Sequence, residues 1–312
     1  RAHLHQAQSV DKTVFEYWTH ALSYLPTAAM PFYISAMKQY WQRRSVWFTA
    51  VTEKDLRKVL ARIRKHGALT IRDIDDDVLV EKDHEWATRK PSKRALQLAF
   101  YRGMVTISQR TGMLKTYELM SRHFAWEKAP KAASETAVLN YLLDRALRSQ
   151  GIVSLDSVCY LDAPRKPAIK RLIEARVRRK ELVPVEIEGA GKLQHWARPE
   201  TLDGAPAPAE DLVHILSPFD PLVHQRKRLQ LFFDYEHRFE AYVPREKRLF
   251  GYFALPVLVG DEIVAAIDLK TDREQQKLLV QQWTWLGNGS RRLRKKRIEE
   301  ALHRFEHFQL AR

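Results

Sequence analysis

One carboxylate in this sequence lies between two prolines and shortly precedes a run of cations. In the stretch LSPFDPLVHQRKR, Asp220 has a proline on each side, and Arg226, Lys227 and Arg228 follow. Each proline fixes its own φ angle and restricts the residue before it to extended geometry, so the loop is expected to be stiff. Asp220 could have one of three roles. It could act in an active site, anchor the loop by accepting backbone N–H groups, or cap the next turn. We favour the anchor, which would fix the loop and orient the three cations.

A second candidate for acid–base chemistry lies near the start of the chain, in FEYWTHALSYLP. If this segment is a helix, Glu16 and His20 are one turn apart on the same face, where a carboxylate and an imidazole can exchange protons. The alternative is an aromatic seam of the core, in which Tyr17 and Trp18 pack and His20 is hydrogen-bonded. That second arrangement is the commoner one.

Other chemistry finds little support in the motifs. GAGKLQ lacks the GxxxxGK[ST] pattern of a phosphate-binding loop, and neither HExxH nor a Cys/His spacing typical of zinc is present. Cys159 is the only cysteine, so an internal disulfide is impossible. We therefore predict no metal and no cofactor.

Two stretches predict the same series of elements. The first runs from TEKDLRKVLARIRKHG, a helix with a capping box at Thr52 and Asp55, through a short extended stretch and the helix PSKRALQLAFYRGM to a hairpin around Gly112. The second runs from SETAVLNYLLDRALRSQG through a short helix capped by Ser154 and the helix PAIKRLIEARVRRKEL to a hairpin at Gly189. Helix, strand, helix, helix and hairpin is the winged-helix order. The alternative is two unrelated α+β pieces.

The charge balance predicts a polyanionic partner. Lys and Arg number 53 against 38 Asp and Glu, a net charge of +15, and nucleic acid is the commonest partner of such a chain. On the last predicted helix of each stretch, basic residues project away from the apolar face, although a solvated charged face is the alternative for any single residue. The residues that we expect at phosphates are Lys170, Arg171, Arg178, Arg179, Lys180, Lys93, Arg94, Arg226, Lys227 and Arg228.

After the linker-like APAPAE, residues 205–210, the sequence predicts antiparallel strands and a final helix. Alternating apolar residues, aromatic residues and a Gly-Asp turn favour a small curled sheet or barrel that includes RLQLFFDYEHRFEAYV. The helix that follows RRLRKKR carries Ile298, Leu302, Phe305 and Phe308 on its apolar face. No apolar run is long enough to span a bilayer, so we expect no membrane partner, and without a signal-peptide core secretion is not indicated. The single cysteine indicates a reducing compartment, so we expect a cytoplasmic protein.

Several segments together carry a resemblance. FEYWTHALSYLP, SPFDP with its basic cluster, LFFDYEHRFEAYVP, KRLFGYFALPVL and AAIDLK occur in this order. They resemble the winged-helix DNA glycosylases of the YcaQ and AlkZ kind over about residues 14–283. The resemblance implies tandem winged helices and a C-terminal β domain around duplex DNA. It also implies excision of cationic N-alkylated purines, with interstrand crosslinks in some members.

The resemblance further implies a catalytic Gln-apolar-Asp or Gln-x-Gln motif on an N-terminal winged helix, upstream of the EYW segment. Gln6-Ala7-Gln8 has matching letters, but Gln8 lies only eight residues before Glu16, so we interpret the match as coincidence. This chain also lacks an initiator Met, so we expect it to be a fragment or to have a true N-terminus that was removed or not seen, and we expect it to lack the catalytic motif. A cationic purine is a good leaving group, so one rigid carboxylate or carboxamide with a placed water is sufficient for its excision.

The sequence therefore predicts an α+β protein of tandem winged-helix motifs, a small antiparallel β-barrel-like domain and a C-terminal helix. The predicted segments are a helical remnant (1–49), two winged helices (50–126 and 130–203), the β domain (204–290) and a basic C-terminal helix (291–312). The predicted function is a monomeric, monofunctional DNA glycosylase with Asp220, Glu16 and Gln8 as catalytic candidates. Alternatives are a non-catalytic winged-helix DNA-binding protein or transcriptional regulator, and an RNA-binding module.

Overall fold

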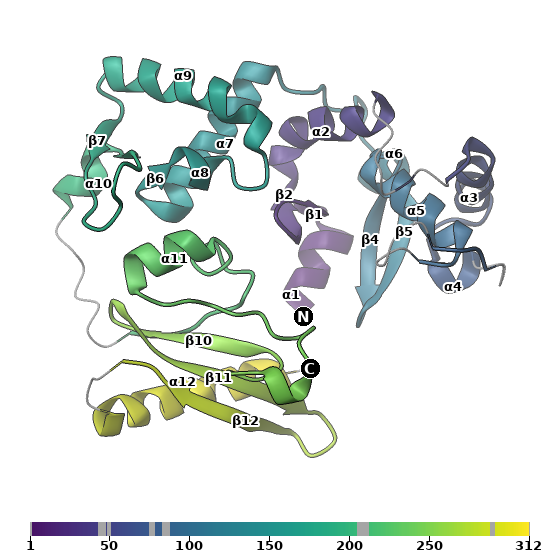
Figure 1. Ribbon diagram of the computed structural model, residues 1–312. Coiled ribbons are helices and arrows are strands. Elements are labelled where there is room, and N and C mark those ends of the chain that lie inside the picture. Colours follow the sequence, from purple (N-terminus) through teal and green to yellow (C-terminus); the bar gives the residue numbers. More distant parts are fainter. Residues whose placement is uncertain are drawn as a thin grey trace. The chain divides into compact units, whose positions relative to one another are not determined.

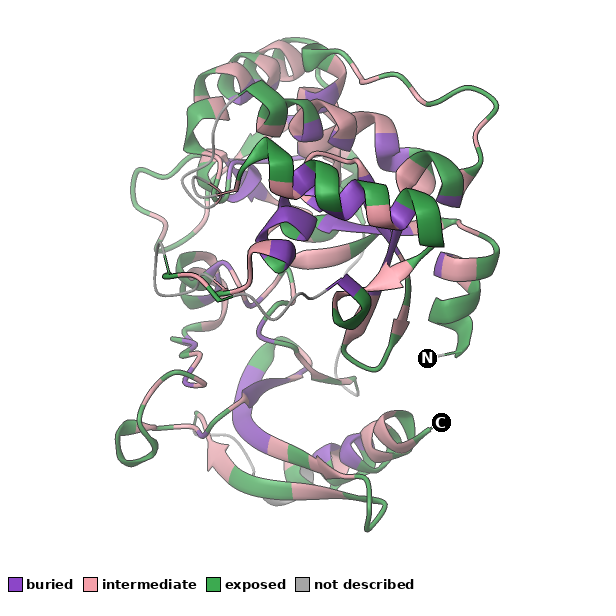
Figure 2. Cartoon of the chain, turned by 90° about the vertical axis from the view of Figure 1, so that its right-hand side faces the viewer, coloured by how far each residue is buried: buried purple, intermediate pink, exposed green. Residues whose placement is uncertain are grey.

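The computed structural model describes residues 2–42, 48, 51–74, 79–82, 88–204, 212–287 and 291–311. The predicted linker at residues 205–210 lies outside this part of the chain. The chain forms two compact units, Arg1–Tyr141 and Leu142–Arg312. Figure 1 shows their elements, and in Figure 2 the helices carry buried residues on one side and exposed residues on the other.

The N-terminal unit starts with short helical turns and a β hairpin. α1 (Ala2–His5) runs into the π-helical turn η1 (Gln6–Val10), and β1 (Val14–Trp18) pairs antiparallel with β2 (Leu22–Pro26). FEYWTH is therefore not the helix on which a pairing of Glu16 with His20 would depend. The run from Val14 to Trp18 is rich in β-branched and aromatic side chains, which favour a strand. Phe15 and Tyr17 pack in the core, whereas Trp18 is exposed.

The turn η2 (Thr27–Ala29) and α2 (Met30–Gln42) lead into the first repeat of the predicted series. It consists of α3 (Glu53–His66), β3 (Leu69–Thr70), α4 (Ile71–Ile74), α5 (Pro91–Tyr101), β4 (Val105–Thr111) and β5 (Leu114–Leu119), with α6 (Met120–Phe124) after it. The Thr52–Asp55 capping box is confirmed, and α3 ends at Gly67, whose φ of 89° suits glycine. Among these residues the strands form one sheet in the order β3-β5-β4.

The second repeat has the same series. It consists of α7 (Glu135–Gln150), β6 (Val153–Ser154), α8 (Leu155–Val158), η4 (Ala163–Arg165), α9 (Lys166–Arg178), β7 (Val183–Val185) and β8 (His195–Ala197), followed by α10 (Pro199–Asp203). The predicted cap at Ser154 is confirmed, since its hydroxyl accepts the Ser157 backbone N–H. The sheet order β6-β8-β7 repeats the arrangement of the first copy, with the last strand in the middle.

The rest of the second unit is built on an antiparallel sheet of the order β12-β11-β10-β9. Its elements are β9 (Val213–Ile215), α11 (Arg226–Phe233), η5 (Arg245–Lys247), β10 (Ala254–Val259), β11 (Glu262–Asp272), β12 (Lys277–Trp285) and α12 (Arg291–Leu310). In the described residues the edge strands β9 and β12 do not pair, so the predicted barrel-like closure is not seen. α12 lies along one face of the sheet and buries Ile298 and Leu302, while Phe308 is exposed, contrary to its predicted inward position (Figure 1).

The predicted strand at RLQLFF is also wrong, because these residues form α11. Arg, Lys, Gln and Leu are good helix formers, and only Leu229 of this helix is fully buried. The segment after α11 is held instead by two buried carboxylates. Glu240 accepts the backbone N–H groups of residues 249–251, and Asp268 accepts those of Tyr252 and Phe253. Backbone that forms no strand is thereby satisfied inside the fold.

Candidate nucleic-acid interface

Helix α9 presents the most basic exposed surface of the second repeat. Ile169 and Ile173 bury one side of the helix, and Leu182 just beyond it is buried as well. Five basic side chains on and after the helix are exposed: Lys170, Arg171, Arg178, Arg179 and Lys180. All five are residues that the sequence predicted at phosphates, and one helix with the turn that ends it brings them together.

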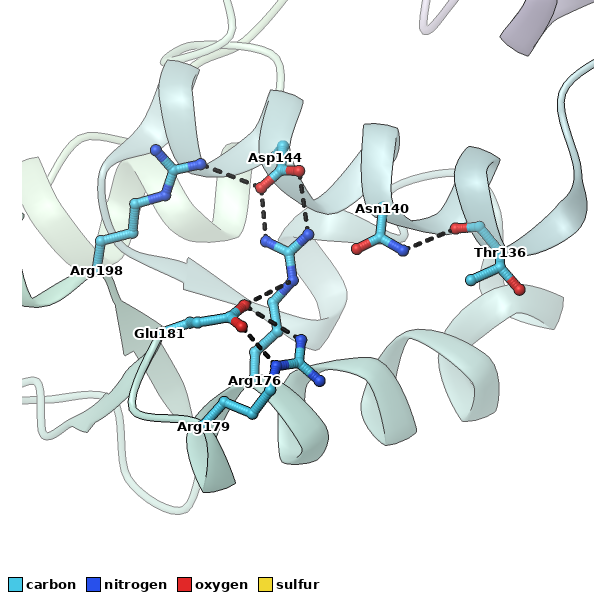
Figure 3. Close-up of polar contacts among 7 residues, drawn as sticks. All are labelled: Thr136, Asn140, Asp144, Arg176, Arg179, Glu181 and Arg198. Atoms are coloured by element: carbon cyan, nitrogen blue, oxygen red, sulfur yellow. Dashed lines mark hydrogen bonds and ion pairs between the residues drawn. The ribbon is translucent and has the colours of Figure 1, made fainter.

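Two other arginines of this repeat are held inside it by Asp144 of α7 (Figure 3). Arg176 donates to both carboxylate oxygens, Nη1 to Oδ1 at 2.6 Å and Nη2 to Oδ2 at 3.0 Å. Arg198 Nη2 donates to Oδ1 at 3.1 Å. The hydrogen bond from Arg176 is the main cause that holds the pKa of Asp144 below its usual value. This cluster fixes α9 against α7, so the cations around it have a defined position.

Arg179 and Lys170 have acidic neighbours. Arg179 Nε lies 2.5 Å from Glu181 Oε1, and Lys170 Nζ lies 4.0 Å from Glu174 Oε1. Both pairs are exposed, and exposed ion pairs contribute little free energy. Exchanging such a carboxylate for a phosphate therefore costs little.

In the first repeat the matching helix α5 behaves differently. Lys93 is exposed, but Arg94 is 4% exposed, and its guanidinium donates to the carbonyls of Thr88 at 2.6 Å and Glu81 at 2.7 Å. Arg94 lies on the face of α5 that also carries Ala95 and Leu98, which turns it inward. The predicted contact of Arg94 with phosphate is therefore corrected: this side chain holds the chain before α5.

Gln8 and Glu16 meet in a buried polar cluster of the N-terminal unit. Gln8 Nε2 donates to Glu16 Oε1 at 2.9 Å and to the carbonyl of Ile107 at 3.0 Å. Arg110 donates from Nε and Nη2 to both oxygens of Glu16, at 2.7 and 2.5 Å. The bond to Glu16 raises the pKa of Arg110. Both carboxylate oxygens are thus occupied by a cation, so Glu16 is poorly placed to accept a proton from water.

His20 does not lie beside Glu16. It lies in the turn after β1, where its Nδ1 is 3.4 Å from the hydroxyl of Thr19. The i, i+4 pairing was inferred for a helix, and β1 removes that geometry. The acid–base pair considered for a helical segment is not formed; Tyr17 packs in the core as in the favoured alternative, whereas Trp18 is exposed.

Asp220 makes its contacts within its own turn. Its Oδ1 accepts the backbone N–H of Leu222 at 2.8 Å, and its carbonyl accepts those of Val223 and His224. The His224 ring Nδ1 lies 2.9 Å from the same carbonyl. The carboxylate accepting a backbone N–H has the form of the predicted anchor and of the predicted turn cap, in one local motif.

The three cations after this loop begin α11 and differ in exposure. Arg226 and Lys227 are exposed, whereas Arg228 is half-buried. Arg228 Nη2 donates to the carbonyl of Gln150 at 3.0 Å, and its guanidinium lies over the ring of Phe232 at 4.4 Å. Burial lowers the pKa of Arg228. The contact of Arg228 with phosphate stays a prediction, and in this structure its side chain lies deeper than those of Arg226 and Lys227.

The sequence missed the residues that hold this surface in place. Asp144 looked like an ordinary helix carboxylate, and its partner Arg176 lies 32 positions further on. The only available signal was an isolated Asp among apolar residues of α7. In the described residues no group of three or more His, Cys, Asp or Glu side chains could hold a metal ion. No described helix is long and apolar enough to cross a membrane.

Comparison with known proteins identifies the class. The sequence model of the family described as "DNA glycosylase AlkZ-like" matches residues 1–308. The chain belongs to this family of AlkZ-like DNA glycosylases. Among solved structures, it is similar to the DNA glycosylase AlkZ of Streptomyces sahachiroi, with a TM-score of 0.58 and 19% sequence identity. The match covers 90% of this chain and 75% of that one, and it shows a shared fold.

Proposed function

We propose that this protein hydrolyses the N-glycosidic bond of cationic alkylated purines in duplex DNA, including those in interstrand crosslinks. The proposed enzyme is monofunctional: it releases the base by hydrolysis and leaves the strand uncut. We further propose that it acts as a monomer in the cytoplasm. Membership of the AlkZ-like DNA glycosylase family supports base excision as the reaction.

We also propose that both repeats are winged helices and that α9 is the helix that contacts DNA. One observation carries this part: the row of exposed cations on α9, held in position by the Asp144 cluster. Arg171, Arg178 and Lys180 have no carboxylate within ion-pair distance among the described residues. A helix with such a row can follow phosphates and release their counterions. α9 is the third helix of its repeat, and the last helix of a helix-turn-helix is the one that enters the major groove.

The catalytic group is not assigned to Gln8, Glu16 or Asp220. The first two form the cluster with Arg110, and Asp220 holds its own turn. We propose structural roles for all three. A purine that already carries positive charge needs little acid help, so a single group that places water and stabilises the oxocarbenium-like transition state is sufficient.

The test is excision of 7-methylguanine from duplex DNA. The 312-residue chain is compared with a form extended upstream of Arg1 by its natural coding sequence, and free base is measured by chromatography. Activity in the extended form supports the proposal and, if absent in the shorter one, locates the catalytic group upstream. Activity in both forms would mean that the catalytic group lies within these 312 residues, and Asp220 would then be tested as that group.

Tight DNA binding by both forms without excision would contradict the enzymatic proposal. Tight binding without excision of a crosslinked duplex as well would rule out the proposed glycosylase activity on both substrates. The protein would then be better described as a non-catalytic DNA-binding protein. Inclusion of an abasic-site substrate checks the monofunctional assignment, since strand cleavage there would overturn it.

A further inference from the structure

A pocket of about 390 Å³ lies within the second unit, at the start of α11. Its walls come from α8 and the turn after it, from the chain that enters β8, and from the first two turns of α11. The volume falls within the range of pockets that hold small organic ligands. Neither the proposed phosphate contacts of α9 nor the family comparison gives this pocket a role.

The pocket is strongly electropositive. Arg226, Lys227 and Arg228 follow one another along its wall, and in the described part of the chain none of them has a carboxylate within ion-pair distance. One carboxylate, Asp156, also lines the pocket, but Lys166 pairs with it. Three cations against one neutralised acid favour an anionic ligand.

Arg228 strengthens this argument because its charge is poorly compensated. Its Nη2 reaches only a backbone carbonyl, and its Nε and Nη1 are buried without a hydrogen-bond partner. A buried charge without a counter-charge is unfavourable. An anion in the adjoining pocket would supply the missing counter-charge from a short distance.

The remaining lining is mixed, with the polar side chains of Ser154, Ser157, His195 and Gln225 beside an apolar part. Leu193 and Leu231 line it, and Tyr160 is held in place because its hydroxyl donates to the carbonyl of His224 at 3.0 Å. The ligand that matches both walls has a phosphate group next to a sugar or an aromatic base. We propose that this pocket binds one nucleotide, with its phosphate at residues 226–228 and its sugar or base against Leu193, Leu231 and Tyr160.

This inference rests on the proposed DNA function and deepens it. The nucleotide has two possible sources, an extrahelical nucleotide of a DNA strand or a free nucleoside monophosphate. Both present the same phosphate and base to the pocket. Competition between them identifies the source.

The test is calorimetric titration with inorganic phosphate, deoxyadenosine and deoxyadenosine monophosphate. The proteins are wild type, the pocket variant R226A/K227A and the control variant R64A/K65A. The control removes two exposed cations from α3, so both variants lose the same charge. The monophosphate is expected to bind most tightly of the three ligands. Its affinity should fall at least tenfold in the pocket variant and stay within twofold in the control.

Two outcomes would overturn the inference: no binding of the monophosphate to wild type, or equal weakening in both variants. If the monophosphate binds, a duplex with one unpaired extra nucleotide is added as competitor. Displacement assigns the pocket to an extrahelical nucleotide, and its absence assigns the pocket to a free one.

Excision of 7-methylguanine is measured on the same proteins to keep the two proposals apart. Excision without nucleotide binding removes the pocket inference alone. Nucleotide binding that depends on Arg226 and Lys227, without excision in any form, removes the enzymatic proposal alone.

Discussion

The two repeats have the same series of elements and the same sheet order, yet they use their cations differently. In the first repeat, Arg94 and Arg110 are turned inward, where they bind backbone carbonyls and the buried Glu16. In the second repeat, Arg176 and Arg198 donate hydrogen bonds to Asp144, and a further row of cations on α9 remains exposed. The number of basic residues on a helix therefore does not indicate how many can reach a phosphate.

If α9 contacts DNA as proposed, this difference gives the two repeats different parts in DNA binding. The first repeat is stabilised by its arginines and offers Lys93 as the exposed basic residue of the predicted set on α5. The second repeat keeps its structural arginines separate from its surface cations. We expect substitutions in the first to change stability and substitutions in the second to change DNA affinity.

The largest effect is expected from Arg110→Ala. It leaves the Glu16 carboxylate, whose side chain is 1% exposed, without its cation, at a cost of about 3 kcal/mol in the free energy of unfolding. Chemical denaturation measures the loss. The exposed Arg57→Ala is the control and should change stability by less than about 0.5 kcal/mol. A loss in Arg110→Ala as small as in the control would show that Glu16 does not depend on Arg110.

The next effect is on affinity. Reversing Arg178, Arg179 and Lys180 to Glu should weaken duplex binding by about tenfold or more near physiological salt, since several phosphate contacts are lost. Fluorescence anisotropy with a labelled duplex measures it. The control reverses Lys54, Arg57 and Lys65 on α3, three exposed cations outside the predicted interface. Equal weakening in both variants would mean that total charge, rather than the α9 surface, determines affinity.

A smaller effect concerns acid stability of the second repeat. Hydrogen bonds from Arg176 and then Arg198 lower the pKa of Asp144 below its unfolded value of 3.8. The contribution of this ionised group is complete above about pH 4 to 5 and is lost as the pH falls through the lowered pKa. The melting-temperature difference between wild type and Asp144→Asn should therefore be constant near neutral pH and shrink below about pH 4. A difference that persists undiminished in acid would contradict the ion-pair role.

The smallest effect is expected from Lys93→Gln. One phosphate contact at most is lost, so duplex affinity should fall by only about twofold to threefold. A decrease as large as that of the α9 triple variant would remove the distinction between the repeats. It would place α5 at the DNA as well.

Local signals in the sequence predicted much of the fold. The capping residues Thr52 and Ser154, the stop at Gly67 and the hairpin turn at Gly112 all act within a few positions of themselves. The apolar residues of α3 recur at the helical period and are buried. Such features depend on backbone conformation and spacing, which a sequence shows directly.

The wrong predictions concern residues whose position depends on contacts with residues elsewhere in the sequence. Glu16 and Arg110 are 94 positions apart, and nothing local indicates that strand β1 would bring them together. The residues of the run FEYW favour a strand, but the run does not show that this strand pairs with β2. For Arg94, a basic residue beside apolar ones looked like a surface cation, and only the carbonyls of residues 81 and 88 turned it inward.

The salt dependence of duplex binding tests the central claim most directly. The variant with Lys170, Arg171, Arg178 and Lys180 changed to Gln is compared with wild type and with Lys93→Gln over a range of salt concentrations. Each lost phosphate contact reduces the slope of log K against log salt by about 0.9. If α9 follows the backbone, the quadruple variant should lose about 3.6 in slope and Lys93→Gln about 1 or less. An unchanged slope in the quadruple variant would contradict α9 as the DNA-binding helix.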